Sequence, residues 1–386
     1  MAFTNRSERK SDPAQARAAM SRNSSSTRAG EGRPRGRRPT IEDIAREAGV
    51  SKATVSRSLS GEPGVSTERR KAIVALARAR GWRPNSAAQA LSRGQTGTLG
   101  WTVRQTPKTA TVDPYFLDLF VGVQLALKGT PFDVLVKLVG SASDEIRQHT
   151  EWVTERRVDG IFLSDVERDD PRLGNLADSG IAVGCIVDDL TADQRVTLPD
   201  DRVARVDPRN AEGVALVVDH LVRHGHRTIV WVLGPAELVA NVERRRALTE
   251  WSHRSPEHTL VIANASLDRT EGVHRAVREV LGHDATAVVV DNDAIASDTI
   301  TTLRASGLRV PQDVAVVSWL GSRESQTSES PITALEYRVT DVGARWAAVM
   351  MRTAYPTFDS LGAVTEPRVE PPALTVGWSS DVHRAE

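Results

Sequence analysis

The sequence has little cysteine and no long apolar run. Cys185 is the only cysteine among 386 residues, which excludes an internal disulfide framework and any zinc site built from several cysteines. No stretch approaches 18 consecutive apolar residues, so we expect no membrane span. The first residues lack the apolar segment of a secretory signal. These absences predict a cytoplasmic protein, in a compartment where thiols stay reduced.

Charge is distributed unevenly although the formal net charge is zero. Residues 1–94 contain 20 Lys and Arg against 8 Asp and Glu, whereas residues 95–386 contain 30 against 42. A basic head on an acidic body indicates a polyanionic partner, and nucleic acid is the first expectation. A membrane surface is the alternative, but the head lacks a basic amphipathic helix with bulky apolar residues.

Residues 1–38 form a basic N-terminal extension rich in Arg, Ser, Ala and Gly. Apart from Phe3 and two methionines it has no large apolar side chain, so it cannot offset the entropy of ordering. We expect the extension to be disordered. Its run at 33–38 is either a basic arm or a solvated tail.

Residues 39–84 predict three short helices. Thr40 and Asp43 have the spacing of a capping box, and Gly49 fits the left-handed residue that ends a helix. A second helix over 52–58 follows at once, which is typical of a helix-turn-helix. The alternative is a plain three-helix bundle, which the neighbouring basic charge disfavours.

The start of the second predicted helix carries small or polar side chains, Lys52, Ala53, Ser56 and Arg57, which suit base edges and phosphates. The stretch from Pro39, PTIEDIAREAGVSKATVSR, resembles the DNA-binding headpiece of the LacI/GalR family of bacterial transcriptional repressors. The resemblance continues at 65–67, 81–85 and 88–91, and extends weakly through the rest of the chain.

The resemblance implies that residues 85–97 form a hinge helix and linker. In that family the helix folds when it pairs with its dimer mate over the minor groove, where Leu91 would be the wedge that kinks the duplex. A linker helix whose leucine packs locally is the alternative. The predicted DNA contacts are Thr40, Ile41, Ser51, Lys52, Ala53, Thr54, Ser56, Arg57, Asn85, Ala88 and Leu91.

From residue 98 onward, apolar runs alternate with amphipathic segments. The strand-like runs are 99–103, 134–138, 160–163, 182–187, 228–233, 287–290 and 314–319, and the helical segments include 116–127, 144–156, 212–223, 293–305 and 339–350. This alternation predicts parallel sheets with helices on both faces, and the stretch is too long for one compact core. We therefore expect an α/β core of two doubly wound parallel-sheet lobes behind a small all-α headpiece.

The body resembles sensors of the periplasmic-binding-protein type, in which the chain crosses between lobes three times. The resemblance implies crossings near 203–208, 320–333 and 351–356. The implied effector-binding and dimerisation core, 98–386, then has a first lobe of about 98–205 with 322–352 and a second of about 206–321 with 353–386.

Ligands of doubly wound sheets bind beyond the carboxyl ends of the strands. The aromatic residues of Asp113-Pro114-Tyr115-Phe116 and the positions of Arg244 and Asp293 match family motifs. An Arg and an Asp facing each other across a cleft can hydrogen-bond neighbouring hydroxyls of a polyol. A solvated loop is the alternative for each position. The predicted effector contacts are Tyr115, Phe116, Ser164, Asp165, Arg244, Asp293 and Trp319.

The sequence departs from the family pattern in three places. Ala247-Leu248 replaces Gly-Phe, residues 318–321 replace Gly-Phe-Asp-Asp, and Gly377-Trp378 stands where an Arg often occurs. The second change removes a carboxylate and adds an indole, which argues against an ordinary monosaccharide as the effector.

An enzyme is a competing class, but the sequence has no G-x-S-x-G, H-E-x-x-H, G-x-G-x-x-G or P-loop pattern. His220, His224 and His226 suggest a metal cluster, yet they match a family run at a helix end, where capping and packing are expected. We therefore expect no metal and no cofactor. A stand-alone sugar-binding protein of the periplasmic type is a further alternative, against which the headpiece argues.

The sequence thus predicts a ligand-responsive transcriptional repressor, cytoplasmic and nucleoid-associated, that binds a near-palindromic double-stranded operator as a homodimer. A small molecule, of which a sugar is one candidate, would bind between the lobes and control DNA affinity through the hinge. Both an inducer and a corepressor remain open. Only ten residues follow 374–376 and contain no leucine heptad, so a dimer is expected and not a tetramer.

Overall fold

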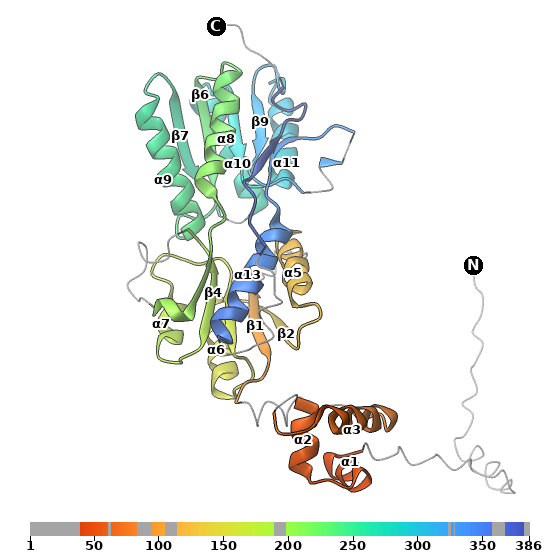
Figure 1. The fold of residues 1–386 in the computed structure, drawn as a ribbon. Coiled ribbons are helices and arrows are strands. Elements are labelled where there is room, and N and C mark those ends of the chain that lie inside the picture. The colour runs from red at the N-terminus through yellow and green to blue at the C-terminus, as the bar shows by residue number, and fades with distance from the viewer. Residues whose placement is uncertain are drawn as a thin grey trace, which may run out of the picture. The chain divides into compact units, whose positions relative to one another are not determined.

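The computed structural model describes residues 39–60, 63–82, 94–104, 114–188, 198–266, 268–322, 326–327, 329–356 and 367–381. The chain divides into two compact units, Met1–Asn85 and Ser86–Glu386 (Figure 1). The predictions for the extension 1–38 and for the hinge contacts Asn85, Ala88 and Leu91 fall outside the described residues.

The first unit contains three helices, α1 (Ile41–Ala48), α2 (Lys52–Ser60) and α3 (Thr67–Ala79). The capping box expected at the start of α1 is present, because the Asp43 amide donates to the Thr40 hydroxyl and the Thr40 amide donates to the Asp43 carboxylate. Gly49 has a φ of 65°, and this left-handed conformation turns the chain into α2 within three residues.

A small core holds the three helices together. Its buried members are Ile44, Ala45, Val55, Ile73 and Ala77. Since α2 contributes Val55 to this core, the opposite face of α2 is left exposed.

The first lobe of the second unit is built on five parallel strands in the order β2-β1-β3-β4-β5. The strands are β1 (Thr98–Arg104), β2 (Asp133–Val139), β3 (Gly160–Leu163), β4 (Ala182–Ile186) and β5 (Val203–Val206). The helices are α5 (Pro114–Leu127), α6 (Ala142–Thr154), α7 (Pro171–Ala177) and α13 (Val339–Ala354), with the 3-10 helix η2 (Asp200–Arg202) before β5. β3 is buried throughout, as expected at the centre of a covered parallel sheet, whereas β2 lies at the edge and is largely exposed.

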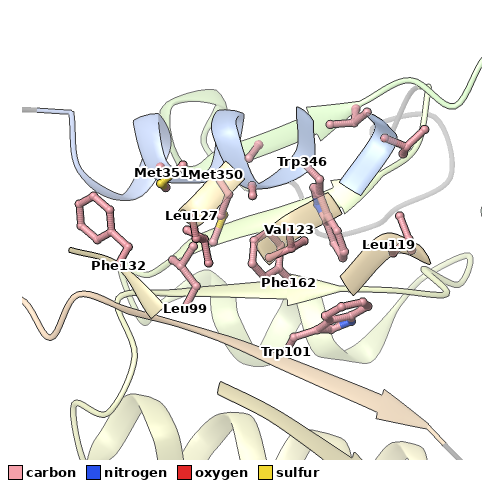
Figure 2. Packing of buried hydrophobic residues seen from close by; sticks show 14 of the residues in the cluster. Leu99, Trp101, Leu119, Val123, Leu127, Phe132, Phe162, Trp346, Met350 and Met351 are labelled. Atoms are coloured by element: carbon pink, nitrogen blue, oxygen red, sulfur yellow. The ribbon is translucent and has the colours of Figure 1, made fainter. Parts of the chain in front are cut away.

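Helices α5 and α13 pack together over one face of this sheet (Figure 1). Figure 2 shows Trp101 and Phe162 of the sheet beneath Trp346 and Met350 of α13, all in one buried cluster. An added Cβ on Gly122 of α5 would lie 2.0 Å from a backbone oxygen of α13, so the two helix backbones are in contact. α13 is therefore fixed to the first lobe.

The second lobe is built on six strands in the order β11-β10-β9-β8-β6-β7, with β11 antiparallel to β10. The strands are β6 (Thr228–Leu233), β7 (Thr259–Asn264), β8 (Ala287–Val290), β9 (Ala315–Ser318), β10 (Thr333–Glu336) and β11 (Ala373–Thr375). The helices are α8 (Asn210–Arg223), α9 (Val239–Arg254), α10 (Arg269–Gly282) and α11 (Asp293–Ala305). Two α/β lobes and a helical first unit confirm the predicted fold class.

Two of the three crossings between lobes differ from the prediction. The first lies at 206–210, between β5 and α8. The second lies at 336–339, because β10 pairs with β9 in the second lobe. The third follows Val369, which packs against the first-lobe core, and precedes β11.

The predicted lobe boundaries at 322 and 353 are therefore wrong. β10 (TALE) has no run of apolar residues, so the sequence pattern did not mark it as a strand of either lobe. Tyr355 follows α13 and stacks on Phe132 of the first lobe with ring centroids 4.3 Å apart, which keeps this segment beyond residue 353 in the first lobe.

Within the described ranges, no helix is both long and apolar enough to cross a membrane.

Candidate functional site

The exposed face of α2 carries four of the predicted DNA contacts. Lys52, Ala53, Ser56 and Arg57 are all exposed. Ser51 caps the helix, because its hydroxyl accepts the Thr54 amide at 3.1 Å. The side chains suited to base edges and phosphates thus stand on one accessible helix end, as the helix-turn-helix prediction requires.

Two of the predicted DNA contacts have structural roles in this unit. Thr40 is half-buried and its hydroxyl is used in the capping box of α1. Ile41 packs against the core of the three helices. Any contact of these residues with DNA would be made by atoms that the fold does not already use.

An ion pair on Lys52 was not predicted from the sequence. The Lys52 ammonium lies 3.0 Å from the Glu42 carboxylate, and both side chains are more than half exposed. An exposed pair of this kind is weak, so DNA can displace Glu42.

Arg244, on α9 of the second lobe, lies at the centre of a cluster of polar side chains. Its Nε donates to Asn210 Oδ1 at 3.1 Å, and one terminal nitrogen donates to Asn241 Oδ1 at 3.1 Å and to Asp291 Oδ1 at 3.2 Å. The guanidinium carbon lies 4.5 Å from the centroid of the Trp319 ring. Arg244 is therefore held in one orientation by hydrogen bonds and by stacking.

Arg244 and Asp293 lie in one lobe, as the predicted bounds of the second lobe imply, but the carboxylate paired with Arg244 is that of Asp291. Both residues belong to the second lobe, and the Asp293 carboxylate accepts hydrogen bonds from the amide and the hydroxyl of Ser322. Asn292 caps α11, which turns Asp293 into the helix, whereas Asp291 stays at the carboxyl end of β8 and pairs with Arg244.

Trp319 supports Arg244 and does not form an open wall. Its side chain is 2% exposed and packs against Trp231 and Tyr337 in the second-lobe core. The indole lies under the guanidinium, so the predicted contact of Trp319 with a ligand could only follow a movement of Arg244.

Tyr337 is a candidate ligand contact that sequence reasoning missed. It lies at the second crossing, packs against the cores of both lobes, and interacts electrostatically with Arg244 and Tyr115. Burial raises the pKa of its hydroxyl, which is buried and has no hydrogen-bond partner among the described residues. The feature of the sequence that could have indicated Tyr337 is an aromatic residue among polar residues just before a predicted helix.

The first-lobe candidates lie near the carboxyl ends of β1 and β3. Ser164 is buried and accepts a hydrogen bond from the Trp101 indole at 3.3 Å. Asp165 has a left-handed φ of 49°, a conformation uncommon for a residue other than glycine. Tyr115 and Phe116 are half-buried at the start of α5, in edge-to-face contact with each other. Tyr115 lies close enough to Tyr337 to interact with it electrostatically, which relates the first-lobe candidates to the surroundings of Arg244.

A buried arginine fixes the loop that follows β3. Arg172 is 1% exposed and donates to the Ser164 and Asp165 carbonyls as well as to the carboxylates of Glu145 and Asp170. Burial lowers the pKa of this guanidinium, but the two carboxylates outweigh burial and hold the pKa above its usual value. The loop that carries Ser164 and Asp165 is therefore rigid.

The two lobes touch along what we call the interlobe seam, formed by residues 166–168 and 188 of the first lobe and 237–246 of the second. Two backbone hydrogen bonds cross it, from the Arg168 amide to the Glu237 carbonyl at 2.7 Å and from the Val239 amide to the Val166 carbonyl at 2.9 Å. Val239 is fully buried in a first-lobe core cluster although it begins α9 of the second lobe.

Polar side chains extend the seam. The Asp188 amide donates to the buried carboxylate of Glu243 at 2.8 Å, and the Asp188 side chain pairs with Arg246 at 3.0 Å. The first two turns of α9 are thus bonded to the first lobe, through residues on either side of Arg244.

The three histidines at the end of α8 have packing contacts. His220 lies 2.7 Å from the Ser380 hydroxyl, His224 2.7 Å from the His220 carbonyl and His226 3.1 Å from the Thr286 hydroxyl. Over the part of the chain that the structure describes, no group of three or more His, Cys, Asp or Glu side chains is placed to hold a metal ion.

Comparison with known proteins decides the family. Residues 40–85 match "Bacterial regulatory proteins, lacI family", and residues 218–380 match a "Periplasmic binding protein-like domain". The chain is 31% identical over 323 residues to the HTH-type transcriptional regulator CelR of Thermobifida fusca, which covers 82% of this chain and 92% of that protein. This chain belongs to the LacI family. The HTH-type transcriptional regulator MalR of Streptomyces coelicolor is also 31% identical, over 78% of this chain and 86% of that protein.

Solved structures agree with this assignment. A CelR–cellobiose complex superposes with a TM-score of 0.63 at 28% identity, covering 89% of this LacI-family chain and all of that one. The lac repressor dimer bound to operator and an anti-inducer gives a TM-score of 0.68 at 20% identity, which shows a shared fold. The predicted ligand-responsive, DNA-binding transcriptional regulator is confirmed, and both the enzyme and the stand-alone binding protein are disfavoured.

Proposed function

We propose that this LacI-family regulator is a homodimeric repressor whose operator affinity is controlled by a polyhydroxylated small molecule bound at Arg244. The observation that carries the proposal is the Arg244 cluster beside the buried Tyr337 hydroxyl. A guanidinium donates to sugar oxygens, the Asp291 carboxylate accepts from sugar hydroxyls, and the Tyr337 hydroxyl does either.

The ligand class follows from the same groups and from the relatives. CelR was solved with cellobiose, and this chain shares with it the fold and 28% of its residues. Leu320, two residues after the end of β9, supplies no carboxylate, and this favours a larger ligand with contacts on both lobes over a single hexose. We therefore propose a disaccharide or short oligosaccharide that reaches from Arg244 toward Tyr115, and we propose that no cofactor takes part.

The DNA half of the proposal uses α2 of each protomer in successive major grooves of a near-palindromic operator, with residues 85–97 as the hinge between the DNA-binding unit and the core. Exposed Leu117 and Leu125 of α5 and Leu138 of edge strand β2 supply apolar surface for a second copy. The protein would act in the cytoplasm, at the nucleoid.

The test is a thermal shift of the full chain with cellobiose and a panel of mono- and disaccharides, because a ligand that binds only the folded state raises the melting temperature. Arg244→Ala is expected to abolish the shift and to leave DNA binding intact. Arg245→Ala is the matched control, since Arg245 is the next residue on α9 and pairs with Asn264 of β7. A full shift in Arg244→Ala would show that the ligand binds elsewhere.

A further inference from the structure

Glu243 is a buried carboxylate whose two oxygens are bonded to different lobes. Its side chain, on α9 of the second lobe, is 6% exposed. One oxygen accepts the backbone amide of Asp188 in the first lobe at 2.8 Å, and the other accepts the side-chain amide of Asn210 in the second lobe at 2.6 Å. Burial raises the pKa of Glu243, so the group is held in a costly environment that these two hydrogen bonds partly offset.

The same Asn210 side chain holds Arg244. Its Nδ2 donates to Glu243 while its Oδ1 accepts the Nε of Arg244 at 3.1 Å, so the amide is oriented from both sides. Asn210 is itself buried and is the first residue of α8, directly after the first crossing between lobes. A continuous series of hydrogen bonds therefore runs from Arg244 through Asn210 and Glu243 to the backbone of the first lobe.

We propose that Glu243 is the positioning residue that couples occupancy at Arg244 to the arrangement of the lobes, through its bond to the Asp188 amide. The proposal rests on the proposed function in one respect, namely that Arg244 is the ligand contact. A ligand that draws the guanidinium away from Asn210 releases that amide, and the Glu243 carboxylate then shifts its bond to Asp188. By reciprocity, a lobe movement that breaks the Asp188 bond alters the orientation of Arg244.

The position of Glu243 requires a side chain with two hydrogen-bond acceptors. Asp188 and Asn210 each present an N–H to Glu243, and an ionised carboxylate accepts both. A glutamine has one acceptor and one donor, so it leaves either the Asp188 amide or the Asn210 amide facing another donor. If Asn210 turns over to relieve that clash, its nitrogen then faces the Nε of Arg244.

The neighbouring ion pair distinguishes coupling from simple lobe contact. Arg246 pairs with the Asp188 side chain at the same seam, but both groups are about half exposed and neither bonds to Arg244 or to Asn210. Loss of that pair weakens the seam without touching the series of bonds that leads to Arg244.

The experiment is hydrogen exchange of the Asp188 amide in the full chain, without ligand or DNA. Glu243→Gln and Arg244→Ala are each expected to accelerate this exchange by roughly tenfold, the effect of losing or weakening one charge-assisted hydrogen bond. The double variant is expected to exchange no faster than Glu243→Gln alone, since both changes act on one series of bonds. Arg245→Ala, which removes the same charge from the next residue of α9, is expected to leave the Asp188 amide unchanged.

Three results would overturn the proposal. One is an Asp188 amide that exchanges at the original rate in Arg244→Ala, and another is equal acceleration by Arg244→Ala and Arg245→Ala. The third is a double variant in which the two effects multiply. Arg244→Lys keeps the charge but loses the Nε donor. It replaces Arg244→Ala in this test if Arg244→Ala folds poorly, and it is expected to accelerate the exchange of the Asp188 amide in the same way. Because no ligand is present, failure of every sugar to bind would refute the proposed effector class and leave this result standing.

Discussion

His149 shows how burial makes one residue sensitive to acid. It is fully buried on α6, with its Nε2 2.8 Å from the Thr102 hydroxyl, which donates to Glu145. Burial, with a contribution from Arg172, lowers the pKa of His149 to about 3, far below the value of about 6.5 for an unfolded chain. The unfolded state therefore binds the proton more tightly, and stability is lost as the pH falls below about 6.5.

We expect His149→Gln to remove much of this acid sensitivity. Between pH 7 and pH 5 the free energy of unfolding of the original protein should fall by about 2 kcal/mol through this residue alone. Urea unfolding at the two pH values measures the difference, with His283→Gln on the exposed end of α10 as the control. An equal acid loss in His149→Gln and in the original protein would show that His149 is not the group that titrates.

Lys52 is the residue for which a base-reading role can be separated from a phosphate contact. A lysine donates to guanine O6 and N7, so Lys52→Ala is expected to relax specificity at one symmetric pair of bases, by about 1–3 kcal/mol per half-site. Glu42→Gln releases Lys52 from its ion pair and should tighten binding to random duplex. Competition binding against a library of operator variants checks both, and a uniform loss for Lys52→Ala across all variants would assign it to a phosphate.

At the scale of elements, most strands that are marked by an apolar run were predicted, and most strands without such a run were missed. The seven predicted strands correspond to β1, β2, β3, β4, β6, β8 and β9, because each is a run of apolar residues between turn signals. β5, β7, β10 and β11 were missed. β5 (VARV), β10 (TALE) and β11 (ALT) contain no run of four apolar residues, whereas β7 (TLVIAN) contains one that was overlooked.

The same limit applies to the candidate site. Arg244 was predicted because it matches a family position, and its cluster is present. Its ion-pair partner Asp291 was not predicted, since Asp291 and Asp293 are two residues apart and only the cap at Asn292 decides which one faces Arg244. Glu243 and Asn210 were missed because their role depends on contacts between α8, α9 and the segment after β4. These elements are distant in the sequence, so no local sequence pattern predicts the contacts.

Helix α13 joins the second crossing to the linker that precedes β1. It starts two residues after Tyr337 and ends at Tyr355, whose hydroxyl donates to Asp159 at 2.8 Å. The Asp159 carboxylate in turn accepts the backbone amides of Thr96 and Gly97. The end of α13 therefore contacts the chain that leads toward the hinge.

We expect Tyr355→Phe to loosen this linker while preserving the stacking on Phe132. Loss of a hydrogen bond to a carboxylate should lower the free energy of unfolding by about 1.5–3 kcal/mol and accelerate hydrogen exchange at Thr96 and Gly97. Tyr337→Phe is the control, because its hydroxyl has no hydrogen-bond partner in the described part of the chain. If Tyr355→Phe leaves hydrogen exchange at both amides unchanged, the end of α13 does not stabilise the linker.

At the scale of the whole molecule, the uneven charge and the exposed apolar side chains point to two different partners. The excess of basic residues in 1–94 suits DNA, and the acidic remainder keeps the core from binding DNA without specificity. Leu117, Val121 and Leu125 are 59%, 41% and 56% exposed and recur every four residues on one side of α5. Val136 and Leu138 of the edge strand β2 add to this apolar surface, and an uncovered edge of this kind invites pairing with another chain.

We therefore expect Leu117→Glu with Leu125→Glu to convert a dimer into a folded monomer, since two copies would bring four carboxylates together at one interface. The molar mass from light scattering should halve, and operator affinity should fall by roughly 10²- to 10⁴-fold because the second half-site no longer binds within the same complex. Leu281→Glu is the matched control, as Leu281 is 52% exposed on α10 of the second lobe. A dimer that survives the double substitution, or one that Leu281→Glu dissociates, would place the interface away from α5.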